Sequence, residues 1–266
     1  MIRDITLGQY YAADSPIHRL DARVKIMATL LFIIELFVVQ DFIGFAICGA
    51  AIMLCVAVSK VPLSFIMRGM KPILLILIFT FCLNIFMVDG RVLWKLGFLK
   101  ITAEGIYTAV FMAVRLIMLI IGSSLLTLTT KPIALTDGIE KLLSPFSKVG
   151  LPAHEIAMMM SIALRFIPML LEETDKIMKA QQARGADFES GKLMERAKAL
   201  VPILVPLFVS AFRIAQDLAM AMEARCYRGG KGRTRMNEIK LQKIDFFASA
   251  ILVIFLCIII AERIIL

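Results

Sequence analysis

An uninterrupted apolar run at 72–88 constrains the fold of this chain more than any other feature of its sequence. The run contains no charged residue and approaches the roughly 20 residues that a helix needs to cross about 30 Å of hydrocarbon. Further apolar runs lie at 25–39, 42–58, 104–128 and 246–260. Hydrophobic residues make up 60% of the chain, above the roughly 45–50% of a soluble domain. We therefore predict an all-α polytopic membrane protein with about five transmembrane helices.

The distribution of Lys and Arg predicts how the chain is oriented in the membrane. If the N-terminus lies inside, the cytoplasmic side receives most of the basic residues, including the whole of 131–243. The outer side then receives Arg91, Lys95, Lys100 and Arg263. Because cytoplasmic loops carry an excess of Lys and Arg, we expect a multi-pass cell-membrane protein with its N-terminus inside and its C-terminus outside.

The charge pattern divides the chain into four expected parts. They are a cytoplasmic N-terminal segment at 1–24, a membrane domain with four spans at 25–130, a cytoplasmic coupling domain at 131–243 and a final transmembrane helix at 244–266. The third span is preceded by a segment at 59–71 that carries Lys60, Arg68 and Lys71, and it is followed by a turn-rich loop.

The coupling domain is expected to contain three helices, two of them long. A short helix begins near Thr136, and the long ones contain apolar stretches at 156–171 and 199–212. These stretches of about 14–16 residues fall short of a full crossing, and each continues into charged sequence without a helix-breaking residue. We expect their N-terminal halves to lie against the membrane underside and their C-terminal halves to reach the cytosol.

Each long helix ends in an Ala-Arg motif, Ala183-Arg184-Gly185 in the first and Ala224-Arg225-Cys226 in the second. In both, alanine lies four residues before the arginine, so each arginine stands at the tip of a narrow apolar row. An arginine at a helix C-terminus also suits the helix dipole, worth about 0.3–1 kcal/mol. Repetition favours the functional interpretation, a pair of charged tips for a pair of related partners. Because Cys226 replaces the glycine, the second helix is expected to continue for another turn toward Gly229.

Glu35 and Arg115 are ionisable residues within predicted spans. Such groups are costly in a membrane and normally face protein or water. They suggest either a structural pair between the first and fourth spans or part of a transport path. The second possibility leads to an alternative function, a self-contained secondary transporter driven by an ion gradient.

The sequence gives no sign of catalysis. It lacks a phosphate-binding loop, H-E-x-x-H and G-x-S-x-G, and the five cysteines lack the spacing of a disulfide framework or zinc site. The net charge of +9 is not accompanied by an aromatic-rich basic module, so nucleic acid is not an expected partner. We expect a protein that is not an enzyme and holds no cofactor or metal.

The paired Ala-Arg ends resemble the hallmark of the transmembrane T component of energy-coupling factor transporters, a class of ATP-driven importers of vitamins and metal ions. That family carries two Ala-Arg-Gly motifs at the ends of long cytoplasmic coupling helices. The first motif matches in full, and the second departs at Cys226. The segment 15–25 is also similar to the family's N-terminal segment, with Ala22 where proline is common.

The resemblance implies a scaffold embedded in the lipid bilayer that links two cytosolic ABC-type ATPases to a small substrate-binding membrane subunit. Each Ala-Arg end would enter a groove on one ATPase, and ATP and Mg²⁺ would be bound by those ATPases. Closure of the ATPases would move the coupling helices and thereby tilt or release the substrate-binding subunit.

Overall fold

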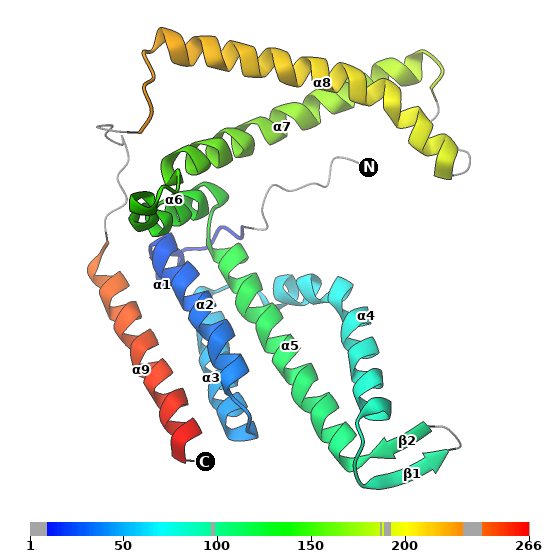
Figure 1. The fold of residues 1–266 in the computed structure, drawn as a ribbon, viewed down its shortest axis with the longest axis vertical. Coiled ribbons are helices and arrows are strands. Elements are labelled where there is room, and N and C mark those ends of the chain that lie inside the picture. Colours follow the sequence, from blue (N-terminus) through cyan, green and yellow to red (C-terminus); the bar gives the residue numbers. More distant parts are fainter. Residues whose placement is uncertain (1–9, 97–98, 187, 189–192, 231–240, 266) are drawn as a thin grey trace. The chain divides into compact units, whose positions relative to one another are not determined.

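The computed structural model describes residues 10–96, 99–186, 188, 193–230 and 241–265. In these residues the chain is helical apart from one β-hairpin and the connecting segments (Figure 1). The elements are α1 Pro16–Arg19, α2 Ala22–Val38, α3 Phe42–Ser59, α4 Leu63–Met87, β1 Val92–Leu96, β2 Leu99–Thr102, α5 Ala103–Thr129, α6 Pro132–Leu143, the 3₁₀ helix η1 Ser144–Val149, α7 Ala153–Ala183, α8 Leu193–Ala224 and α9 Lys243–Ile265. The all-α fold class predicted from the sequence is confirmed.

The chain forms two compact units. One comprises Gly8–Gly138 with Glu238–Leu266 and contains the helices α2, α3, α4, α5 and α9, which we call the five-helix unit. The other includes Ile139–Asn237 and contains η1, α7 and α8, which we call the α7–α8 unit. The division falls within α6, so that helix belongs in part to each unit.

Local capping explains where several helices of the five-helix unit begin. Asp21 caps α2 by accepting a hydrogen bond from the Arg23 backbone N–H at 2.9 Å, as its position before an apolar run predicts. The Thr102 hydroxyl caps α5 by accepting from the Gly105 N–H at 3.0 Å, and it donates to the Val88 carbonyl at 2.7 Å. The start of α9 is tied to the start of α2, because the buried Asp245 carboxylate accepts a hydrogen bond from the Asp21 N–H at 2.8 Å.

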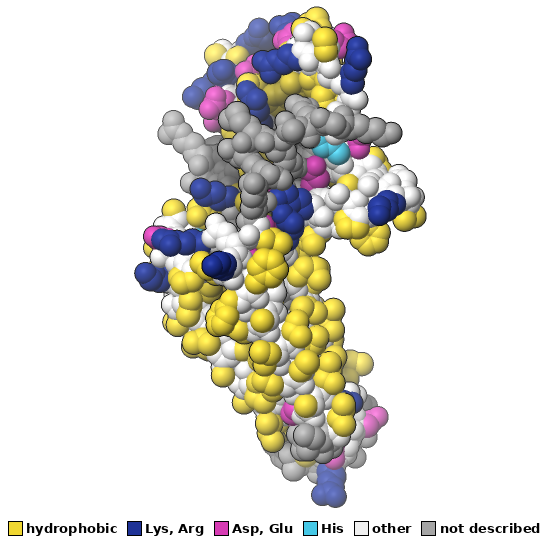
Figure 2. All heavy atoms as spheres, turned by 90° about the vertical axis from the view of Figure 1, so that its left-hand side faces the viewer, with side chains coloured by type: hydrophobic (Ala, Val, Ile, Leu, Met, Phe, Trp, Pro, Cys, Tyr) yellow, Lys and Arg dark blue, Asp and Glu magenta, His cyan; other side chains and the backbone are white. Residues whose placement is uncertain are grey.

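The core of the five-helix unit is small compared with its apolar surface. Its main cluster consists of Leu36, Val39, Phe45, Cys48, Phe111 and Ile259. Many large apolar side chains point outward instead, and Figure 2 shows apolar side chains over much of the face of this unit that it draws. Soluble monomers rarely expose contiguous apolar patches beyond a few hundred Å², so this surface indicates a hydrocarbon environment.

The helix α4 begins before the predicted third span. The basic segment that precedes the span is largely helical, since Leu63–Lys71 and Ile73–Met87 form two helical halves bent by 64°. Residue 72, between the two halves, is a proline, which has no backbone N–H to continue the helical hydrogen bonds. The predicted third span therefore corresponds to the second half of α4.

The segment after α4 is a β-hairpin where the sequence suggested a turn-rich loop. β1 and β2 pair antiparallel, with Trp94 opposite Ile101 and Leu96 opposite Leu99. Apolar and polar residues alternate along β2, the pattern typical of a strand, whereas β1 begins with three consecutive apolar residues. The hairpin joins the ends of α4 and α5 in Figure 1.

Length and apolar content qualify five helices as possible membrane spans: α3, α5, α7, Leu200–Ala224 of α8, and α9. The two halves of α4 make a sixth if they count as one span. With 17 residues, α2 lies at the lower end of the roughly 17–25 that span a membrane. The apolar stretches of α7 and α8 were expected to be too short, but both helices are long enough, so length does not exclude a crossing.

Candidate functional site

The two Ala-Arg ends terminate helices of nearly equal length. α7 has 31 residues and α8 has 32, and both contain proline: Pro168 in α7, and Pro202 and Pro206 in α8. Each helix ends at the alanine of its motif, Ala183 or Ala224, so the arginine is the first residue beyond the regular helix. The motifs therefore stand at helix ends, as the sequence predicts.

The two helix ends have the same backbone hydrogen bonds. After α7, the Gly185 N–H donates to the Gln182 carbonyl at 2.9 Å and the Ala186 N–H donates to the Gln181 carbonyl at 3.0 Å. This pair of bonds, one spanning three residues and one spanning five, is the Schellman termination of a helix. It fixes the backbone of Arg184 between the last helical turn and a left-handed residue.

The end of α8 repeats this arrangement. The Cys226 N–H donates to the Glu223 carbonyl at 2.8 Å and the Tyr227 N–H donates to the Met222 carbonyl at 3.0 Å. Cys226 has φ +54°, in the left-handed region, where Gly185 has φ +87°. The expected extra turn toward Gly229 is therefore wrong. Four backbone bonds of the same kind hold both arginines in the same local geometry, although left-handed φ costs an L-residue roughly 1–2 kcal/mol.

Both arginines project from exposed tips. Arg184 and Arg225 are exposed, and so are the motif alanines, Ala183 and Ala224. Within the described part of the chain, neither guanidinium has a hydrogen-bond or ion-pair partner. Each therefore keeps five N–H donors free for a partner, in the planar arrangement that suits carboxylates and carbonyl groups.

The two tips lie at opposite ends of the helix pair. The Gln181 side chain near the end of α7 donates to the Pro202 carbonyl in the first third of α8, at 3.4 Å. The Gly230 backbone beyond α8 lies against the His154 ring at the start of α7. The helices therefore run antiparallel and cross, as Figure 1 shows, and a partner bound at Arg184 is separate from one bound at Arg225.

An apolar stripe follows one face of α8 between the two tips. Val201, Val205, Phe208 and Phe212 recur at the spacing of a helix face, and their exposed fractions rise from 53% to 69%. The sequence analysis missed this surface, although the spacing could have indicated it. Exposed aromatic and aliphatic side chains at such spacing are typical of a helix that packs on a partner.

The structure does not join Glu35 and Arg115 in an ion pair. The Arg115 Nη2 donates to the Val39 carbonyl at 2.9 Å, where α2 ends, and the guanidinium lies 5.1–5.7 Å from the ring centres of Phe37, Phe45 and Phe111. Glu35 is buried, and its Oε1 accepts no hydrogen bond from the described residues. Arg115 thus closes the α2–α3 turn inside the bundle, which is a structural use of the charge.

The described residues hold no group of three or more His, Cys, Asp or Glu side chains that could bind a metal ion. The two histidines make local contacts instead. His18 bonds to Ser15 and Tyr11, and His154 Nδ1 lies 3.2 Å from Glu140 Oε1.

Comparison with known proteins gives the family. The model of the CbiQ family, described as "Cobalt transport protein", matches residues 13–236. The energy-coupling factor transporter transmembrane protein of Clostridium kluyveri is 59% identical over 266 residues, covering 99% of this chain and 98% of its own length. The proteins of that name from Thermosediminibacter oceani and Bacillus subtilis are 59% and 49% identical, covering 93% and 90% of this chain and 93% and 91% of their own. The chain therefore belongs to the family of transmembrane T components of energy-coupling factor transporters.

Proposed function

We propose that this chain is the scaffold of an energy-coupling factor importer and that Arg184 and Arg225 each dock one cytosolic ATPase. The observation that carries this proposal is the pair of matching helix ends, each with an exposed arginine and identical backbone bonds, at opposite ends of α7 and α8. Two equivalent tips are better suited to binding two related partners than to binding a single partner.

The orientation that this function requires agrees with the charges of the five-helix unit. At the end where α2 and α9 begin, Arg19, Arg23, Lys25 and Lys60 lie within or beside the helix ends, whereas Arg91 and Arg263 belong to the other end. The excess of basic residues favours the first end as cytoplasmic. α7 and α8 follow the chain from that end, so we assign them to the cytoplasmic side and the C-terminus to the outside.

The substrate-binding subunit is the expected partner of the apolar stripe on α8. A helix that carries exposed Phe208 and Phe212 needs an apolar surface to cover it. A small membrane subunit lying partly at the cytoplasmic interface would supply one. Motion of the ATPases at the Arg tips would then be transmitted along α7 and α8 to this contact. In this arrangement ATP and Mg²⁺ are bound by the ATPases, and the vitamin or metal ion is recognised by the substrate-binding subunit.

Co-purification with the ATPases tests the docking role. Arg184→Glu and Arg225→Glu should each weaken ATPase association by at least about 30-fold, since losing a partner from a buried charged contact costs about 2–5 kcal/mol. Lys179→Glu and Arg228→Glu are matched controls, because they reverse an exposed charge within five residues of each tip. The controls should retain the ATPases. Equal retention by all four variants would overturn the docking role and leave only the favourable helix-dipole interaction.

A further inference from the structure

An open cavity lies at the end of the five-helix unit where α2 begins and α5 ends. It has a volume of about 480 Å³ and is lined by the stretch before α1, by α1, by the start of α2 and by the residues that follow α5. The acidic and basic side chains around it are Asp14, His18, Arg19, Lys25 and Lys131. Cations therefore outnumber anions on its wall.

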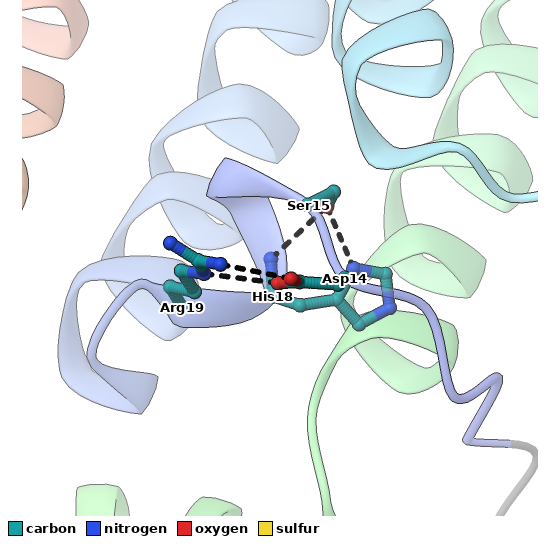
Figure 3. A network of polar contacts seen from close by, with 4 residues as sticks. All are labelled: Asp14, Ser15, His18 and Arg19. Atoms are coloured by element: carbon teal, nitrogen blue, oxygen red, sulfur yellow. Dashed lines mark hydrogen bonds and ion pairs between the residues drawn. The ribbon is translucent and has the colours of Figure 1, made fainter.

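The single acid at this cavity is already neutralised. Figure 3 shows Arg19 meeting Asp14 through two hydrogen bonds, from Nε at 2.9 Å and from Nη2 at 2.8 Å. These bonds lower the pKa of the Asp14 carboxyl, which therefore stays ionised and paired. In the same network the Ser15 hydroxyl and His18 Nδ1 lie 2.7 Å apart. The charges left over at the cavity are those of Lys25 and Lys131.

Three hydrogen-bond donors of this cavity wall remain available. The Lys25 Nζ donates to the His18 carbonyl at 3.2 Å and the Thr129 carbonyl at 2.9 Å, which leaves the third N–H of the ammonium group. Lys131 is exposed, with its Nζ 5.6 Å from the centre of the Tyr10 ring. The Thr130 side chain is 6% exposed, and its hydroxyl finds no hydrogen-bond partner in the described chain. A buried hydroxyl without a partner, close in the chain to the Lys131 ammonium group, can donate a hydrogen bond to an anionic oxygen.

A second, apolar cavity adjoins the first. It has a volume of about 310 Å³ and lies among α2, α3, α5 and α9, lined by side chains such as Leu54, Val58, Leu125 and Ile251. Leu20, Lys25 and Thr129 line both cavities. The basic opening and the apolar pocket therefore share a wall, with Lys25 at their junction.

We propose that these two cavities together bind one anionic phospholipid. Its phosphate would contact Lys131, the free N–H of Lys25 and the Thr130 hydroxyl, and one acyl chain would occupy the apolar cavity. A free phosphate ion would occupy only the basic opening, whereas a phospholipid would occupy both the basic opening and the apolar cavity. The negatively charged cytoplasmic leaflet supplies such lipids at the side where the Lys and Arg excess places this end. The site lies outside the Arg184 and Arg225 tips and goes beyond the docking function.

The test measures the unfolding temperature of the full chain, purified and delipidated in mild detergent, against increasing dioleoyl-phosphatidylglycerol. Phosphatidylcholine with the same chains and inorganic phosphate are the comparison ligands. We expect phosphatidylglycerol alone to raise the unfolding temperature. Lys131→Gln should weaken its binding about fivefold, as expected for one basic residue at a membrane surface. Adding Thr130→Val to Lys131→Gln should weaken phosphatidylglycerol binding further. Lys71 is an exposed lysine outside both cavities, so Lys71→Gln should have no effect.

Filling the apolar cavity with a larger side chain distinguishes a phospholipid from inorganic phosphate as the ligand. Ala248→Phe, or Ala28→Leu if the first variant does not fold, should reduce phosphatidylglycerol binding and leave any response to inorganic phosphate unchanged. Equal stabilisation by inorganic phosphate and phosphatidylglycerol, unaffected by filling, would overturn the lipid assignment. Equal binding by wild type, Lys131→Gln and Thr130→Val would overturn the site itself.

Discussion

The five-helix unit and the α7–α8 unit both expose large apolar side chains, but the two surfaces differ in how charges are distributed among them. In the five-helix unit, α3, α5 and α9 contain 18-residue windows with mean hydropathy of 2.4, 2.3 and 2.8. In α7 and α8 the corresponding values are 1.4 and 1.5. Figure 2 shows the same contrast, since Lys, Arg, Asp and Glu are interspersed with apolar side chains in the α7–α8 unit and are sparse over much of the other.

Exposure of apolar groups therefore does not by itself identify a lipid-facing surface. A span can tolerate few charges because each is costly in hydrocarbon. A helix that packs against partner proteins needs an apolar stripe on one face only and can carry charges on the others. The predictions below test whether the two surfaces differ in this way.

The largest expected difference between the two surfaces is in how they respond to the same charge, introduced at equally exposed phenylalanines. Phe79 in α4 is 61% exposed and Phe208 in α8 is 63% exposed. An Asp near the centre of a span costs about 2.5–3.5 kcal/mol on insertion, so Phe79→Asp should greatly reduce the amount of inserted protein. Phe208→Asp should leave that amount near normal and weaken association with the substrate-binding subunit. Quantitative membrane immunoblotting and co-purification measure the two effects, and equal loss of inserted protein in both variants would contradict the distinction.

Removing the Arg115 charge should have the next largest effect. Arg115→Gln weakens the bond to the Val39 carbonyl and removes a cation from three aromatic rings, so we expect a loss of about 1–3 kcal/mol in unfolding free energy. Glu35→Gln should cost less, because Glu35 forms no ion pair with Arg115. Denaturant unfolding in detergent of the two single variants and the double variant gives their coupling. We expect a coupling below about 0.5 kcal/mol, whereas rescue by the double variant would support the pair predicted from the sequence.

The two helix ends should respond in opposite directions to changes at their left-handed residues. Cys226→Gly removes the unfavourable left-handed φ of a residue with a Cβ and should stabilise the α8 end by about 1 kcal/mol. Gly185→Ala introduces that cost at the α7 end and should destabilise it by a similar amount. Local hydrogen exchange at each helix end measures both effects. Loss of stability on Cys226→Gly would show that the cysteine side chain has a role that the backbone does not explain.

A small pH effect is expected at the end of the five-helix unit where α2 begins. Burial lowers the pKa of His18 below its usual 6.5, although the hydrogen bond to the Tyr11 carbonyl opposes the shift. The unfolded chain therefore takes up the proton first, and stability should fall as the pH drops below about 6.5. His18→Gln should remove this dependence in a thermal unfolding series from pH 8 to 5. The same slope in wild type and variant would assign the effect to another group.

The sequence was sufficient to predict the long helices and the placement of Arg184 at a tip, because periodic apolar residues and a following glycine are local signals. It could not predict the end of α8 at Ala224. A left-handed cysteine is locally unfavourable, and it persists because two backbone bonds satisfy carbonyls of the last helical turn. The family resemblance noted at the Ala-Arg ends was confirmed by the relatives over nearly the whole chain.

Other features depend on tertiary structure and carried weaker signals. The bend in α4 falls at Pro72, and no local signal was used to predict that Leu63–Lys71 is helical. Arg115 was recognised as an unusual charge, yet its partner is a backbone carbonyl at the end of α2 that only folding brings close. The cavity at Lys25 and Thr130 combines segments more than 100 residues apart, so no local pattern indicates it.

ATP-driven uptake by the Arg184→Ala/Arg225→Ala variant shows whether the two arginine tips couple the ATPases to transport. The variant is produced with its ATPases and substrate-binding subunit, at a membrane level matched to wild type, and uptake is measured with the labelled substrate of that subunit. We predict that uptake is abolished while the substrate-binding subunit still co-purifies, because the alanine variant keeps α7, α8 and the apolar stripe. Uptake at the wild-type rate, with both ATPases retained, would contradict the proposal that the two arginine tips transmit the motion of the ATPases.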